Sequence, residues 1–158
     1  MSFDVFLQKF AAGEPVEVDR DSVLAVLQTR EFIGPDEFGF YIVKFPGGVD
    51  VELSAKGLNG GAIFTGCAFH IRGMSPHLIS FIFEIARAGD MVVLPAMEDF
   101  VPILSSPEQK QQLPPDSAQH SPGAVVCRSP AELGALLSGG YAGWQEYRNQ
   151  ILNKPPSI

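Results

Sequence analysis

The feature that most constrains the fold is a run that combines a helix, a stop and a buried strand within residues 75–94. Ser75 is a suitable helix N-cap, Pro76 fits the first helical turn, and the apolar residues that follow recur at helical spacing. Gly89 follows the last periodic residue, where we expect a left-handed cap. Residues 91–94 are then continuously apolar, as in a strand covered on both faces. The chain therefore packs helices on a sheet, with this unit near its centre.

Alternating apolar and polar residues predict further strands. Residues 38–45 and 49–54 alternate on either side of a Pro-Gly-Gly turn, which indicates a β-hairpin. Residues 62–72 predict another strand, in which Gly66 marks a bulge or a close approach by another backbone. Residues 2–10 fit both a strand and a helix. We favour the strand, because aromatic and β-branched residues dominate this segment.

Helix caps predict the remaining helices. Residues 19–31 fit a helix that begins at an aspartate cap, and residues 32–38 then form a connection. A Ser-Pro-Ala-Glu sequence with the features of a capping box predicts a helix over residues 130–138. The C-terminal portion adds shorter elements: an edge strand at 101–104, a brief helix that begins near residue 105 and ends before residue 114, an exposed loop at 113–123, a strand at 124–127 and a helix at 141–152.

This order of elements predicts an α+β fold, with helices on one face of a mainly antiparallel sheet. The core resembles a split β-α-β arrangement. The length of 158 residues and the apolar fraction of 46% suit one domain with a substantial core. We expect the core in residues 1–104, a mixed C-terminal portion in residues 105–152 and a frayed tail in residues 153–158.

The net charge of −7 is concentrated in the first part of the chain, because residues 1–37 hold 8 acidic and 3 basic side chains. An acidic surface repels nucleic acid and anionic membranes, whereas it suits a basic protein partner. Solubility alone also explains such a charge. No charge-free apolar stretch is long enough to span a bilayer, and the N-terminus has no signal-peptide pattern, so we expect a cytoplasmic protein.

The chain has no recognisable catalytic, metal or cofactor motif. Its glycine-rich segment at residues 57–61 fits a turn, because neither a helix nor a Gly-Lys-Ser/Thr sequence follows it. The histidines and cysteines have no metal-ligand spacing. Cys67 and Cys127 fit buried free thiols. Strand alternation places His70 on the face opposite to Cys67, so His70 could act as a base for a catalytic Cys67 only if the strand bulges at Gly66. We therefore expect neither a metal nor a cofactor.

Two sets of residues are candidates for binding. The first, a ligand site, combines the end of the predicted strand at 62–72, the start of the central helix and the loop after the buried strand, where ligand sites often form; its members are His70, Arg72, His77, Glu98 and Asp99. A solvated loop is the alternative for the two acids. The second, an interface on the last predicted helix, consists of Tyr141, Trp144 and Tyr147. Their spacing also fits a helix docked on the core.

The opening residues carry a resemblance to a group of proteins. Ser2-Phe3-Asp4-Val5-Phe6, followed by Gly13-Glu14-Pro15, resembles a loose group of small uncharacterised bacterial proteins, and so do the later Phe-Ile-Phe-Glu helix and the Gly89-Asp90 step. The resemblance extends over about two-thirds of the chain and rests on core and turn patterns. Some small acidic bacterial proteins of this kind are immunity proteins of toxin systems, which implies a similar role by analogy.

We therefore expect a non-enzymatic protein-binding module of the bacterial cytoplasm, with an immunity or regulatory role. Its support is the acidic N-terminal third, the lack of a catalytic constellation and a surplus of aromatic residues. Self-association through an edge strand is a second mode of binding that the sequence leaves open. The alternative is a small-molecule-binding protein or enzyme, with a pocket near the loop that follows residues 91–94.

Overall fold

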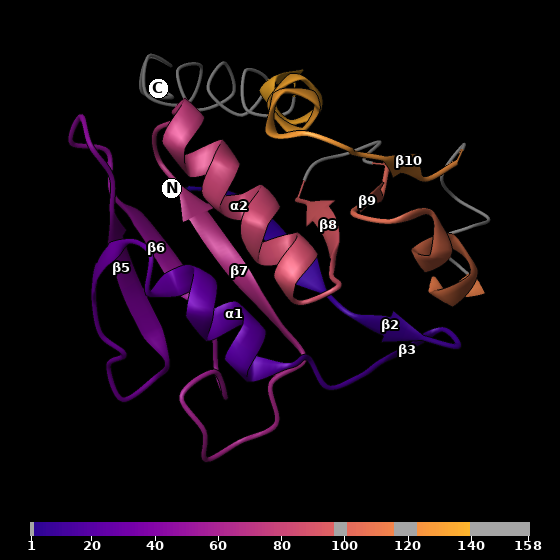
Figure 1. Ribbon diagram of the computed structural model, residues 1–158, viewed down its shortest axis with the longest axis horizontal. Coiled ribbons are helices and arrows are strands. Elements are labelled where there is room, and N and C mark those ends of the chain that lie inside the picture. The colour runs from indigo at the N-terminus through magenta and orange to yellow at the C-terminus, as the bar shows by residue number, and fades with distance from the viewer. Residues whose placement is uncertain (1, 97–100, 116–122, 140–158) are drawn as a thin grey trace, which may run out of the picture.

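The computed structural model describes residues 2–96, 101–115 and 123–139 of the chain. The fold is α+β, as predicted, with helices packed on a mainly antiparallel sheet of eight strands (Figure 1). In chain order the elements are β1 (Phe3–Gln8), β2 (Phe10–Ala11), β3 (Glu14–Pro15), α1 (Arg20–Leu27), β4 (Glu31–Ile33), β5 (Phe40–Lys44), β6 (Val51–Ser54), β7 (Gly66–Ile71), α2 (Pro76–Ala88), β8 (Val92–Pro95), β9 (Ile103–Leu104), the 3₁₀ helix η1 (Pro107–Gln112), β10 (Val125–Val126) and a helix over residues 130–139.

The strands of the large sheet lie in the order β10-β9-β8-β1-β7-β6-β5-β4, and β2 pairs with β3 in a separate two-stranded sheet. All pairs in the large sheet are antiparallel except β9–β10. β1 lies between β7 and β8, which α2 connects, so these elements form a split β-α-β unit. The predicted strand at residues 2–10 is confirmed and lies at the middle of the sheet.

The strand predicted over residues 62–72 is shorter and begins at Gly66, which marks a close approach of two backbones, one of the two alternatives predicted for it. Gly66 pairs with Gln8 at one end of the β1–β7 ladder. A Cβ atom at this position would collide with the carbonyl oxygen of Leu7. Glycine is therefore the residue that lets β1 and β7 pair at this point.

The helix α2 is the centre of the hydrophobic core. Ser75 caps it by accepting a hydrogen bond from the Leu78 amide at 3.2 Å, and Pro76 lies in its first turn, as predicted. The Phe81 ring contacts Phe69 of β7 and Phe45, with ring centroids 5.9 and 5.6 Å apart. These contacts direct one side of α2 against the face of the sheet to which Phe69 belongs.

The end of α2 differs in one detail from the prediction. Gly89 has a φ of −92°, and Asp90 adopts the left-handed conformation with a φ of 53°. The prediction of a left-handed Gly89 is therefore wrong. The position is tightly packed instead: a Cβ atom would lie 2.7 Å from Met91 Cε and 2.9 Å from Val18 Cγ1, so these side chains would have to shift.

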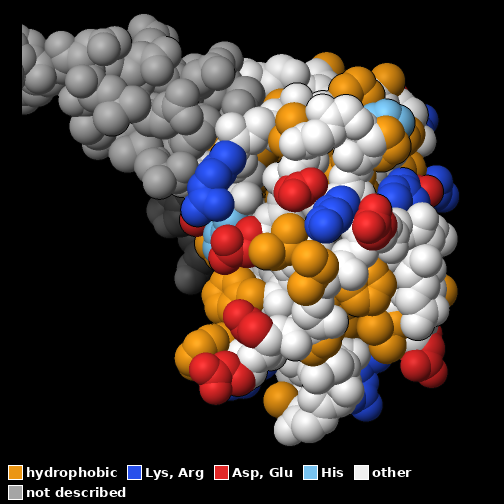
Figure 2. Space-filling model, turned by 90° about the vertical axis from the view of Figure 1, so that its left-hand side faces the viewer, with side chains coloured by type: hydrophobic (Ala, Val, Ile, Leu, Met, Phe, Trp, Pro, Cys, Tyr) orange, Lys and Arg blue, Asp and Glu red, His pale blue; other side chains and the backbone are white. Residues whose placement is uncertain are grey.

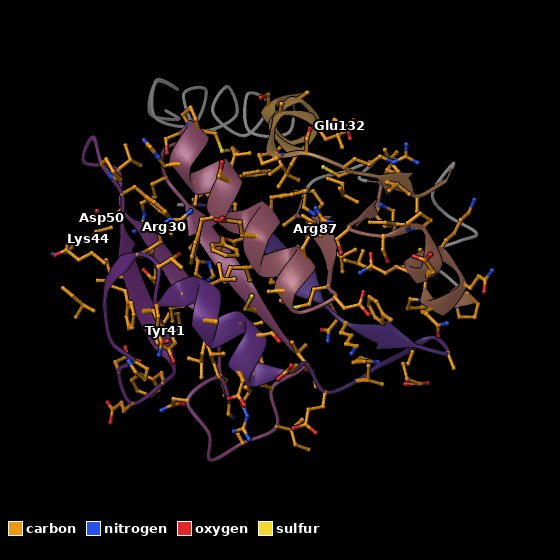
Figure 3. All side chains as sticks on the ribbon, viewed as in Figure 1. Arg30, Tyr41, Lys44, Asp50, Arg87 and Glu132 are labelled. Carbon is orange, nitrogen blue, oxygen red and sulfur yellow. The ribbon has the colours of Figure 1, made fainter. Side chains whose placement is uncertain are left out.

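The helix α1 packs beside α2 and is shorter than predicted. It begins after the Asp19 cap and ends at Leu27, and Glu31 belongs to β4, which pairs with β5. The predicted helix end at Glu31 is therefore wrong, and the predicted connection at 32–38 is wrong for its first residues. Pairing with β5 makes residues 31–33 a strand. Arg30, in the turn after α1, contacts α2 (Figure 3): its Nη2 is 2.6 Å from Glu84 Oε2, and its guanidinium lies over the Phe81 ring.

The C-terminal portion continues the sheet and returns to the helical layer. β9 pairs with β8 and is not an edge strand as predicted, because β10 pairs with its other side. The helix over residues 130–139 places Leu133 and Leu137 in the core. Gln109 of η1 is 5% exposed, and it donates to Asp90 Oδ1 and accepts from the Ser105 amide. η1 is thereby joined to the turn after α2.

None of the helices in the described ranges is long and apolar enough to cross a lipid bilayer. The predicted helix at 141–152, the tail at 153–158 and most of the exposed loop at 113–123 lie outside these ranges.

Candidate functional site

One face of the sheet, over β1, β7, β6, β5 and β4, is directed away from α1 and α2, and we call it the open face. Side chains alternate along each strand, so residues next to the buried Val5, Val43, Leu53 and Phe69 belong to this face. The strand register aligns them in two cross-strand rows, one with three ionisable groups and one that is mainly apolar. The rows are Ile33–Ile42–Glu52–His70–Asp4 and Phe40–Ser54–Ala68–Phe6.

Large apolar side chains are exposed on or beside the open face. Phe6 and Ile42 are 44% and 45% exposed, Ile33 is 57% exposed, and Phe38, in the turn before β5, is 68% exposed. Single exposed apolar residues are common on soluble proteins, but a cluster on one surface is typical of an interaction site.

Three of these side chains surround a hollow of about 710 Å³, which we call the β4–β5 hollow. Two carboxylates and a Gly-Pro step complete its lining. The residues are Ile33, Gly34, Pro35, Asp36, Phe38, Phe40, Ile42 and Glu52. Figure 2, which views the molecule from the side of β5 and β6, shows that apolar side chains on this side lie among acidic and basic ones.

Next to the hollow, His70 pairs with Asp4 across β7 and β1. The two residues are direct register partners, and His70 Nδ1 lies 2.9 Å from Asp4 Oδ1. An ionised carboxylate only accepts, so Nδ1 carries the proton and donates it. The Ser2 hydroxyl donates to the same Asp4 oxygen at 2.6 Å, and the Phe40 ring lies 6.2 Å from the His70 ring.

This Ser-Asp-His group differs from a catalytic triad in its connectivity. In a triad the serine contacts the histidine nitrogen that faces away from the aspartate. Here Ser2 contacts the aspartate itself. The pair is also partly solvated, with side chains 23% and 34% exposed. The arrangement therefore fixes the His70 ring on the open face and provides no activated nucleophile.

The predicted ligand site is only partly assembled. His70 lies within β7 on the open face, and Arg72 follows the end of β7, where its Nη1 lies 4.0 Å from Glu52 Oε2. His77 is exposed in the first turn of α2, and α2 packs against the opposite face. The structure therefore separates His77 from His70, because the chain crosses from one face of the sheet to the other between them.

The other predicted binding residues lie outside the described ranges: Glu98, Asp99, Tyr141, Trp144 and Tyr147. The described chain before Glu98 ends at Ala96, whose amide donates to the Asp4 carbonyl at 2.9 Å.

The cysteines fit the prediction of buried free thiols. Burial raises the pKa of the Cys67 thiol to about 12 and also raises the pKa of Cys127. Cys67 belongs to the covered face and His70 to the open face, so they do not form a nucleophile–base pair. Within the described parts of the chain, no three His, Cys, Asp or Glu side chains are placed to hold a metal ion.

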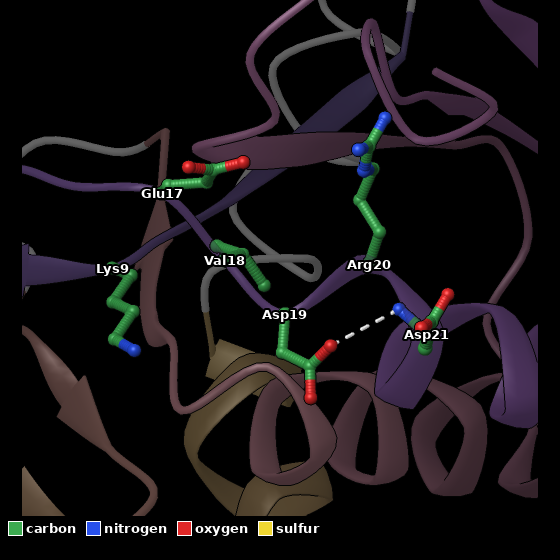
Figure 4. A pocket seen from close by; sticks show the side chains of 6 residues that line it. All are labelled: Lys9, Glu17, Val18, Asp19, Arg20 and Asp21. Carbon is green, nitrogen blue, oxygen red and sulfur yellow. Dashed lines mark hydrogen bonds between the residues drawn. The ribbon is translucent and has the colours of Figure 1, made fainter.

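A second hollow, of about 410 Å³, lies at the start of α1 and is lined by residues 17–21 and Lys9. Asp19 Oδ1 accepts from the Asp21 amide at 3.2 Å, and the hydrogen bond from Ser22 Oγ lowers the pKa of the Asp19 carboxyl. Figure 4 shows the Lys9 and Arg20 side chains extending in different directions. The two cations do not converge on one point, so they do not form a joint binding site. The hollow is the charged surface around the Asp19 cap of α1.

Sequence reasoning missed Asp4, Phe38, Phe40 and Glu52 as parts of one surface. The only signal in the sequence was the alternation of apolar and polar residues, which places Asp4 and Glu52 on the solvated sides of their strands. The grouping of Asp4 and Glu52 depends on the β1–β7 and β6–β7 registers, which pair both of them with the distant His70.

Comparisons of the chain with models of protein families, with curated proteins and with solved structures find no match.

Proposed function

We propose that the protein is a non-enzymatic protein-binding module that contacts its partner through the open face. The observation that carries this proposal is the cluster of Ile33, Phe38 and Ile42, which are 45–68% exposed around one hollow. Apolar and aromatic anchors of this kind supply most of the binding energy in protein interfaces.

The polar groups of the open face support binding rather than catalysis. The Asp4–His70 pair is fixed by hydrogen bonds beside the apolar cluster, and Glu52 with Arg72 forms a partly exposed ion pair. Apolar anchors surrounded by charged groups are typical of interfaces that form between folded, soluble proteins. A site for acid–base catalysis would instead be a cleft shielded from solvent, in which the pKa values of the acid and the base are shifted to suit the reaction.

The setting of the proposed activity is the bacterial cytoplasm, with an immunity or regulatory role. Its support is the resemblance of the opening segment to small bacterial proteins and the net charge of −7, which favours a basic partner.

The test is affinity capture from the native cells with a matched pair of variants. The face variant combines Phe38→Ser with Ile42→Thr, and the control variant combines Ile63→Ser with Leu136→Gln. The control residues are also exposed, at 73% and 38%, and do not line the hollow. Circular dichroism first verifies that both variants are folded.

We expect a stoichiometric partner that the wild type and the control variant retain and that the face variant loses. The partner is then purified, and its affinity for each form is measured by calorimetry. Equal affinity for the face variant and the wild type would contradict the proposal.

A further inference from the structure

We propose that the β4–β5 hollow binds an arginine side chain of the partner, flanked there by apolar residues. This inference rests on the proposed function and specifies the chemistry that the open face recognises. It follows from the lining of the hollow, which combines apolar side chains with two carboxylates and contains neither lysine nor arginine.

Asp36 gives the hollow a fixed negative charge. Its Oδ1 accepts hydrogen bonds from the amides of Phe38 and Phe40, both at 2.9 Å. These bonds hold the loop between β4 and β5 in place around the carboxylate. Oδ2 has no hydrogen-bond partner among the residues that the structure describes, so it is available to a cation.

Glu52 supplies the second carboxylate from the floor of the open face. It is the register partner of Ile42 on one side and of His70 on the other, so its strand position is well defined. Its side chain is 37% exposed and lies 4.0 Å from Arg72 Nη1, at the limit of an ion pair. Such exposed pairs are weak, so an incoming cation can compete for Glu52.

The aromatic residues favour arginine over lysine. Phe38 and Phe40 both line the hollow, and Phe38 presents most of its surface to solvent. A guanidinium is planar and weakly hydrated, so it can stack on an aromatic ring while it donates to a carboxylate. A lysine ammonium is more strongly hydrated and loses more on entering an apolar hollow.

The first test is an NMR titration of the full chain with three short peptides, acetyl-Leu-X-Leu-amide, where X is arginine, lysine or citrulline. Citrulline keeps the planar shape of arginine and removes its charge. We expect arginine to shift the amide resonances of residues 33–42 and 52, with an affinity about five- to tenfold above that of citrulline and above that of lysine. Equal affinity for arginine and citrulline, or an absence of shifts in these residues at millimolar peptide, would overturn the inference.

The second test uses two substitutions that should act in opposite directions. Glu52→Gln removes a carboxylate and should weaken arginine-peptide binding about three- to fivefold. Arg72→Gln removes the competing cation and should strengthen it about twofold. A purely structural effect of either change would alter the affinities of the arginine and citrulline peptides equally, and that result would also overturn the inference.

The two proposals fail in different ways. If the Phe38→Ser, Ile42→Thr variant loses its cellular partner while Glu52→Gln retains it at wild-type affinity, the open face binds a protein but not through arginine. If the partner binds the face variant at wild-type affinity, the proposed function itself is wrong.

Discussion

The two faces of the sheet are built from the same strands but differ in what covers them. On the covered face, Val5, Val43 and Phe69 are completely buried against the helices. On the open face, Phe6 and Ile42 occupy alternate positions of β1 and β5 and remain 44–45% exposed. The same apolar chemistry therefore has two roles: it stabilises the fold on one face and is available for contact on the other.

The largest expected effect compares two phenylalanines, one from each face. Phe69→Ala should lower the free energy of unfolding by about 3–5 kcal/mol, because it leaves a cavity against Phe81. Phe6→Ala, on the open face, should lower it by about 1 kcal/mol, because part of that ring already contacts water. Urea denaturation followed by circular dichroism measures both. Equal losses would mean that the open face is as important to stability as the core.

The same contrast applies to polar side chains. Gln109→Ala should destabilise the protein by about 1–3 kcal/mol, because Asp90 and the Ser105 amide then lose their hydrogen-bond partner. The control Gln111→Ala, at an exposed position of η1, should change stability by less than about 0.5 kcal/mol. A similar small effect for both variants, again by urea denaturation, would show that the buried bonds to Gln109 contribute little.

A smaller effect is expected at the hydroxyl of Tyr41, on the covered face of β5 (Figure 3). This oxygen is buried and lacks a hydrogen-bond partner among the described residues, and burial raises the pKa of the phenol. Tyr41→Phe should therefore leave the free energy of unfolding unchanged or raise it by up to about 1 kcal/mol. A clear loss in a calorimetric scan would indicate that the hydroxyl bonds to a water or to another group.

The smallest effect concerns Asp19, the exposed cap of α1. The hydrogen bond from Ser22 lowers its folded-state pKa below the usual 3.8. The ionised form therefore stabilises the fold above pH 3.8, and this contribution disappears as the pH falls through the lower folded-state pKa. Asp19→Asn keeps a capping oxygen that does not titrate. Between pH 5 and pH 2 the wild type should lose slightly more stability than the variant in urea titrations; parallel losses would contradict this assignment.

The elements that the sequence predicts well are those with strong local signals. The caps of α2 and of the helix at 130–139, and the alternation that defines β5 and β6, depend on residues close together in the chain. β4 was missed because its three residues become a strand only by pairing with β5. The contact between Asp4 and His70 spans 66 positions, so local patterns predict that each is solvated but not that they meet.

The central position of β1 has a consequence for how the protein is made. Both neighbours of β1 follow it by a long stretch of chain, and the partner of Gln8 in β7 is Gly66. During synthesis, β1 therefore has two unpaired edges until the ribosome has released β7 and then β8. Closing such long loops slows folding, and unpaired apolar strands are prone to associate with other chains. β1, at the centre of the finished sheet, is thus synthesised long before the two strands with which it pairs.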